Sequence, residues 1–128
     1  MATARKFLVP VDGSKSSRKA LYYAIELAGY LDAEITVFHV VDKSGEKELL
    51  KSKRMLGENR SLVSSKSIPV EAKLVKGDPG KEIVVEAKKD YNLIVIGSLG
   101  HSGLTRMILG SVAENVARKS PIPVTIVR

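Results

Sequence analysis

The sequence contains no cysteine, which excludes disulfide bonds and thiolate metal sites. It also lacks an apolar run that approaches the roughly 20 residues of a membrane-spanning helix. The chain is polar from Met1 to Lys6, and the apolar stretch from Phe7 to Val11 is too short for the core of a secretory signal. From these absences we expect a cytoplasmic protein that does not use a membrane.

Aromatic side chains are also scarce, with two phenylalanines, four tyrosines and no tryptophan. The formal net charge of +7 would suit nucleic acid, but the basic residues are spread along the chain and form no arginine-rich arm. Few aromatic residues are available to stack on bases. Solubility and a general attraction for polyanions, including nucleotides, are therefore the favoured explanations of the charge, and a nucleic-acid-associated protein is the less favoured alternative.

What the sequence does contain is a regular alternation of two hydrophobic patterns. Short β-branched or alternating runs predict five strands, at 5–11, 34–41, 69–75, 93–96 and 122–127. Apolar residues at helical spacing predict helices between them, at 14–31, 43–65, 78–89 and 111–119. Gly57 suggests a break in the second of these helices.

Polar residues at the predicted helix starts can satisfy the unpaired N–H groups there. Ser14 or Ser16 could cap the first helix, and Asp78, which a proline follows, is expected to cap the third. Ser111 and Glu114 have the spacing of a capping box for the last helix.

Strands that alternate with helices imply an α/β fold, in which a doubly wound parallel sheet is covered by helices on both faces. The length fits one domain that spans residues 1–128. In such sheets ligands bind beyond the carboxyl ends of the strands, where the strand order reverses. Three loops with small or polar residues leave those ends, at 12–14, 41–42 and 97–111, and we expect them to converge on one site.

Glycines with a particular spacing occupy the last of these loops. Gly97 and Gly100 are followed, after nine residues, by Gly110 and Ser111, directly before a predicted helix. Glycine allows sharp bends and close approach of backbone to a ligand, and a helix start offers N–H groups to an anion. A strand, a glycine loop and a helix start in this order suggest a cradle for phosphates.

This spacing resembles the nucleotide-binding signature of the ATP-binding universal stress proteins. The resemblance extends over the whole chain, through the opening motif 7–14 (FLVPVDGS), the strand end 39–42 (HVVD), the turn 77–79 (GDP) and the closing motif 120–124 (SPIPV). It implies a Rossmann-like, five-stranded parallel sheet in the order 3-2-1-4-5. It also implies that ATP binds across the carboxyl edge of the first and fourth strands.

The resemblance implies positions for the base and the ribose. Pro10 and Val11 match the family's proline and apolar residue on the adenine side. Asp12 matches the aspartate that meets the ribose, and its carboxylate oxygens can accept hydrogen bonds from ribose hydroxyls. Val40 matches a residue that meets adenine through its backbone.

The resemblance also implies positions for the remainder of the nucleotide. Gly97 lies on the ribose side, and the site includes Ile96, which precedes it. The residues expected around the phosphates are Gly100, Gly110, Ser111 and Val112. His101 in the same loop could touch phosphate or a metal, or could remain solvated. Mg²⁺ or Mn²⁺ is expected with the triphosphate, held by phosphate oxygens and water, with no metal ligand assigned to the protein.

The chain departs from the family pattern at Leu99, where many relatives have a polar or basic residue. One phosphate contact is therefore in doubt, and a member that has lost nucleotide binding is an open alternative. No P-loop motif occurs anywhere in the sequence, so the phosphates would be held in a different way.

No arrangement of residues in the sequence is typical of a catalytic site. His39 lies in an apolar strand and is more typical of a hydrogen-bonded core histidine than of a catalyst. A binding and signalling module is therefore favoured over an enzyme, and a slow ATPase is the alternative. The last strand, from Ile122 to Val127, is an apolar edge that invites pairing, and the resemblance implies a homodimer formed through it.

Overall fold

The computed structural model describes residues 5–42, 45–99 and 109–128. One parallel sheet is built from β1 (Lys6–Pro10), β2 (Glu34–Val41), β3 (Val70–Lys76), β4 (Leu93–Gly97) and β5 (Val124–Val127). The strand order is β3-β2-β1-β4-β5, which confirms the predicted topology. The helices of the described residues are α1 (Lys15–Leu31), α2 (Glu46–Ser65), α3 (Pro79–Ala87) and α4 (Ser111–Lys119).

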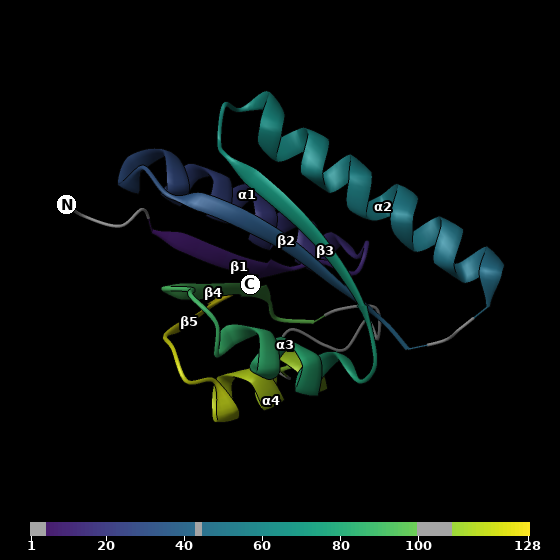
Figure 1. The fold of residues 1–128 in the computed structure, drawn as a ribbon. Coiled ribbons are helices and arrows are strands. Elements are labelled where there is room, and N and C mark those ends of the chain that lie inside the picture. The colour runs from purple at the N-terminus through teal and green to yellow at the C-terminus, as the bar shows by residue number, and fades with distance from the viewer. Residues whose placement is uncertain (1–4, 43–44, 100–108) are drawn as a thin grey trace.

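The helices cover the two faces of the sheet in pairs. Figure 1 shows α1 and α2 on one face and α3 and α4 on the other. Side chains alternate across a strand, so each strand contributes to both cores. Val9 and Ile35 pack with α1 and α2, whereas Leu8 and Phe38 belong to the cluster that packs against α3 and α4.

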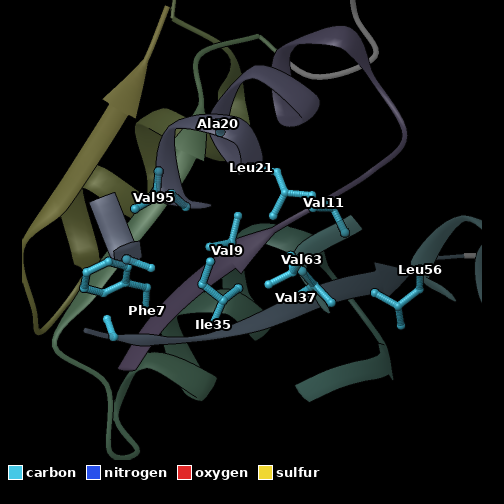
Figure 2. Packing of buried hydrophobic residues seen from close by; sticks show 13 residues of the cluster. Phe7, Val9, Val11, Ala20, Leu21, Ile35, Val37, Leu56, Val63 and Val95 are labelled. Atoms are coloured by element: carbon cyan, nitrogen blue, oxygen red, sulfur yellow. The ribbon is translucent and has the colours of Figure 1, made fainter. Parts of the chain in front are cut away.

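The larger of the two cores lies under α1 and α2. Figure 2 shows Leu21 of α1 beside Val9 and Val11, with Val37 and Val63 close by. All of these side chains are buried. At about 25 cal/mol per Å² of apolar surface, this burial is the main force that holds the helices on the sheet.

The helix starts agree with the sequence except at α4. Ser14 caps α1, because its side chain accepts a hydrogen bond from the Ser17 N–H at 3.1 Å, and Asp78 caps α3 in the same way. The predicted capping box of α4 is wrong. Gly110 is the cap residue and makes no side-chain cap bond, so Ser111 is the first helical residue. The Gly110 carbonyl accepts the first bond of the helix, from the Glu114 N–H at 2.9 Å, and the Gly110 N–H is held by the Ser98 carbonyl at 2.7 Å.

The second helix and the last strand also differ from what the sequence pattern predicts. The second helix is continuous through Gly57, because Leu56 and Val63 anchor it to the core on either side of that residue. The last strand begins at Val124, since the Ser120 hydroxyl bonds both the N–H and the carbonyl of Ile122 and forms a turn there.

A buried carboxylate ties α3 to the edge strand β3. Glu86 is 4% exposed, and it accepts hydrogen bonds from Lys73 at 2.8 Å and from the Tyr91 hydroxyl at 2.7 Å. The Lys89 ammonium lies 3.0 Å from its other oxygen. Burial alone would raise the pKa of Glu86, but the hydrogen bonds from Lys73, Tyr91 and Lys89 outweigh it, and the pKa is lowered. The hydrogen bond to Glu86 raises the pKa of Lys73.

One hydroxyl beside this cluster has no hydrogen bond. Thr36 is 1% exposed, and its Oγ1 has no partner among the described residues. Burial, and then the hydrogen bond to the Glu86 carboxylate and its negative charge, raise the pKa of Tyr91.

Candidate functional site

A cavity of about 540 Å³ lies at the carboxyl edge of the sheet, where the order reverses between β1 and β4. Both faces of the sheet contribute to its walls. The ends of β1, β2 and β4 form the floor, the starts of α3 and α4 form one side, and the first half of α2 forms another. The lining residues are Pro10, Val11, Asp12, Ser17, Phe38, His39, Val40, Val41, Asp42, Glu48, Lys51, Ser52, Met55, Pro79, Ile83, Ile96, Gly97, Leu99, Ser111, Val112 and Ala113.

Asp12 is held on the cavity wall by the turn that joins β1 to α1. Its Oδ1 accepts a hydrogen bond from the Ser14 N–H at 2.9 Å, and Gly13 supplies the required φ of 83°. The Ser17 hydroxyl accepts the Asp12 N–H at 3.3 Å. The carboxylate is therefore fixed in position, half-buried, at the point where the strand ends.

Gly97 allows the end of β4 to lie against the first turn of α1. A Cβ at this position would lie 2.5 Å from the Ser16 hydroxyl oxygen and 2.6 Å from the Ser16 carbonyl oxygen. The same hydroxyl accepts the Leu99 N–H at 3.1 Å. Ser16 therefore positions the start of the glycine loop, a contact across 83 residues of sequence.

Gly110 lies where two stretches of backbone come into contact. It does not line the cavity, and a Cβ there would lie 2.5 Å from the Leu99 carbonyl oxygen. Glycine is needed because two stretches of backbone touch. The consequence is that α4 begins directly at the cavity, with Ser111, Val112 and Ala113 in its wall. No side chain among the described residues caps this helix start, and the macrodipole favours an anion there.

His39 is half-buried, and both of its ring nitrogens are hydrogen-bonded. Nδ1 lies 2.7 Å from the Val11 carbonyl oxygen, which can only accept, so Nδ1 carries a proton. Nε2 lies 3.2 Å from the Ser52 hydroxyl. This arrangement agrees with a satisfied histidine, and it ties α2 to the floor of the cavity.

Most of the residues proposed from the sequence lie together around this cavity. They are Pro10, Val11, Asp12, Val40, Ile96, Gly97, Ser111 and Val112. Gly110 supports the wall from behind, and Gly100 and His101 lie outside the described residues. Whether these residues contact a ligand stays a prediction.

Sequence reasoning missed two walls of the cavity. Glu48, Lys51, Ser52 and Met55 come from α2, and Pro79 and Ile83 come from α3. The apolar stripes of these helices were visible in the sequence, but their position relative to the strand ends was not. Nothing in the spacing indicated that α2 would extend over the end of β2.

Residues 3–128 match the Universal stress protein family. The chain belongs to this family. The universal stress protein MJ0531 of Methanocaldococcus jannaschii is 34% identical over 139 residues, which cover 97% of this chain and 82% of that protein.

Solved universal stress proteins have the same fold. The UspA protein from Lactobacillus plantarum superposes with a TM-score of 0.86 at 26% identity, over 100% of both chains. A universal stress protein solved in complex with cAMP has a TM-score of 0.81 at 27% identity, over 99% of this chain and 98% of that one.

Two further findings on this universal stress protein concern metal sites and membrane helices. Within residues 5–42, 45–99 and 109–128, no group of three or more His, Asp or Glu side chains could hold a metal ion. No helix in the same part of the chain is long and apolar enough to cross a membrane.

Proposed function

We propose that this universal stress protein binds an adenine nucleotide, ATP in the first instance, in the cavity at the carboxyl edge of the sheet. One observation carries the proposal: a single cavity joins an uncapped helix start, a fixed carboxylate and an apolar floor. These are the three kinds of surface that phosphates, a ribose and a base require. The protein would act as a nucleotide-linked module of the stress response.

The phosphates would lie against the first turn of α4. The N–H groups of Ser111 and Val112 belong to that turn, and each favourable charge near a helix start contributes roughly 0.3–1 kcal/mol. The exposed Ser111 side chain can donate a further hydrogen bond. Mg²⁺ or Mn²⁺ would be held mainly by phosphate oxygens and water.

The ribose would meet Asp12, and the base would lie over the end of β2. Phe38 accepts the Val11 N–H at 2.8 Å, so the backbone groups of Phe38 point toward β1. Backbone direction repeats every two residues in a strand, so the N–H and carbonyl of Val40 point to the same side, beyond the end of β1 at Pro10. They would be available to the edge of an adenine ring, with Pro10 and Ile83 as apolar neighbours.

Two further observations support the proposal. A related universal stress protein with 27% identity was solved in complex with cAMP, which is an adenine nucleotide. The cavity also lies at the topological switch point, where open parallel sheets bind their ligands. A localisation in the cytoplasm fits such a ligand.

The active unit would be a homodimer formed through β5. Both β3 and β5 are edge strands, but they differ in charge. β3 carries Glu71, Lys73 and Lys76, which discourage pairing with another strand, whereas β5 has no charged residue. Two copies of β5 could pair antiparallel about a two-fold axis. A monomeric mass by light scattering at micromolar concentration would contradict this assembly.

The binding proposal is tested by substituting Asp12 with asparagine. Asparagine keeps an oxygen for the Ser14 N–H but loses the charge, so the turn should survive while ribose contact weakens. We expect about a tenfold loss of affinity for a fluorescent ATP analogue measured by anisotropy. The matched control is Asp90→Asn, an exposed aspartate that does not line the cavity, and it should bind like the wild type. Equal affinities for the two variants would contradict the assignment of Asp12.

A further inference from the structure

The outer face of α1 carries three exposed tyrosines, half of the exposed large apolar side chains among the described residues. Of the four tyrosines in the sequence, three lie on this helix. Tyr30 is 82% exposed, Tyr22 52% and Tyr23 43%, and Leu31 at the end of the helix is 37% exposed. The other exposed large apolar residues among those described, Leu50 and Val85, lie singly on different helices.

The helix geometry explains why these side chains form one surface. Ser17, Leu21, Ala24 and Ala28 are buried and define the face that packs on the sheet. Tyr22, Glu26 and Tyr30 are spaced by four residues on the opposite face, and at 1.5 Å per residue the two tyrosines lie about 12 Å apart along the axis. We call the surface of Tyr22, Tyr23 and Tyr30 the α1 tyrosine face.

The start of the same helix carries a cluster of positive charge. Lys15, Arg18 and Lys19 are exposed, and the first turn has no acidic residue. Cations at a helix start oppose the macrodipole, so these residues do not stabilise the helix by their charge. None of the three lines the cavity, and no ion pair joins them to another residue in the described part of the chain. Neither the packing of the fold nor the lining of the cavity therefore accounts for these three cations.

We propose that the outer face of α1 docks an acidic, amphipathic segment of a partner protein. Tyrosine and arginine are the residues that most often carry the energy of protein interfaces. Acidic side chains of the partner would face Lys15, Arg18 and Lys19, and its apolar side chains would cover the α1 tyrosine face. A single donor group on the partner would face Glu26.

The charge pattern argues against two other occupants. Glu26 is the only acidic residue of α1 and lies one turn from both Tyr22 and Tyr30, so it would repel phosphates that followed the tyrosines. A second copy that packed its own α1 on this face about a two-fold axis would bring the same three cations, with only Glu26 of α1 to oppose them. An acidic, amphipathic segment avoids both conflicts, because its acidic side chains can be confined to the start of α1, opposite Lys15, Arg18 and Lys19, whereas a nucleic acid carries a phosphate at every nucleotide.

The test is a selection of displayed helical peptides on the purified chain, followed by fluorescence anisotropy with the enriched peptides. One variant, Y22S/Y23S/Y30S, removes the aromatic surface, and another, K15E/R18E/K19E, reverses the charge. The matched control, K47E/K53E/R54E, makes the same charge change on exposed positions of α2. Circular dichroism and urea unfolding establish that each variant is folded.

We expect enriched peptides that combine Asp or Glu with an apolar stripe. Both α1 variants should weaken binding by about tenfold or more, whereas the α2 control should change it by less than about threefold. The proposal is overturned if no peptide is enriched, or if the enriched peptides bind Y22S/Y23S/Y30S as well as the wild type. It is equally overturned if a labelled oligouridylate, and no peptide, binds through these tyrosines.

Discussion

Alanine in place of Gly97 tests how closely β4 must approach α1 for the site to form. The new Cβ would lie 2.5 Å from the Ser16 hydroxyl oxygen and 2.6 Å from the Ser16 carbonyl oxygen. Both distances are shorter than 3.0 Å, and Cβ atoms in real structures essentially never come that close to another heavy atom. The hydroxyl can rotate away, but the carbonyl belongs to the backbone. The strand or the helix must therefore shift by roughly half an ångström.

The expected magnitude follows from two opposing terms. Forcing an extra methyl group into packed structure costs about 1–3 kcal/mol. Replacing glycine by alanine also restricts the unfolded chain, and this effect alone would raise the free energy of unfolding by about 0.4–1 kcal/mol. The variant should therefore lose about 1–2 kcal/mol of unfolding free energy, which corresponds to roughly 5 °C in Tm for a chain of this size.

Gly57→Ala is the matched control. Gly57 lies in the middle of α2, and a Cβ there would meet no atom within 4 Å, so the same substitution should stabilise the protein by about 0.5–1 kcal/mol. Urea unfolding followed by circular dichroism measures both changes. If Gly97→Ala shifts the midpoint in the same direction as Gly57→Ala, the close approach of β4 to α1 is not a real constraint.

The remaining predictions concern the buried cluster and the α4 start. Glu86→Gln should lower the unfolding free energy at pH 7 by about 2 kcal/mol in urea titrations, less than for a fully buried pair because Lys73 and Lys89 are partly solvated. Since the native pKa of Glu86 lies below its ordinary value of 4.5, the ionised form stabilises the fold above that pH, and the difference from the variant should shrink as the pH falls through the native pKa. Thr36→Val should raise the unfolding free energy by about 1 kcal/mol, because it removes an unpaired buried hydroxyl, and a clear loss of stability would reveal a partner for that oxygen. Gly110→Ala should lower stability and nucleotide affinity together, because its Cβ would push α4 away from the backbone of Ser98 and Leu99; an unchanged midpoint would count against this contact.

The elements of the fold were predictable because each strand and helix carries its own periodic pattern. Ile35 and Val37 alternate with Thr36 and Phe38, and the structure places these two pairs on opposite faces of the sheet. The strand order could not be predicted in this way, because periodicity does not say which strands become neighbours. It was predicted from the resemblance to universal stress proteins.

The details that sequence reasoning missed depend on contacts between distant segments. Gly110, the cap residue of α4, is fixed by a hydrogen bond from its N–H to the Ser98 carbonyl, and no local sequence pattern encodes this bond. The position of the α2 wall of the cavity depends on the hydrogen bond between the Ser52 hydroxyl and His39 Nε2. Glu86 could have been noticed, since it interrupts the apolar stripe of Ile83 and Ala87, but its partners Lys73 and Tyr91 come from other elements.

The central claim is that the first turn of α4 holds the phosphates of an adenine nucleotide. A titration of ¹⁵N-labelled protein with ATP and Mg²⁺, followed by amide NMR, tests it directly. The account predicts saturable shifts of the Ser111 and Val112 amides, while the amides of Lys6 and Asn92, at the opposite edge of the sheet, stay unchanged. If the Ser111 and Val112 signals do not move with ATP, ADP or AMP up to millimolar concentration, the claim is wrong.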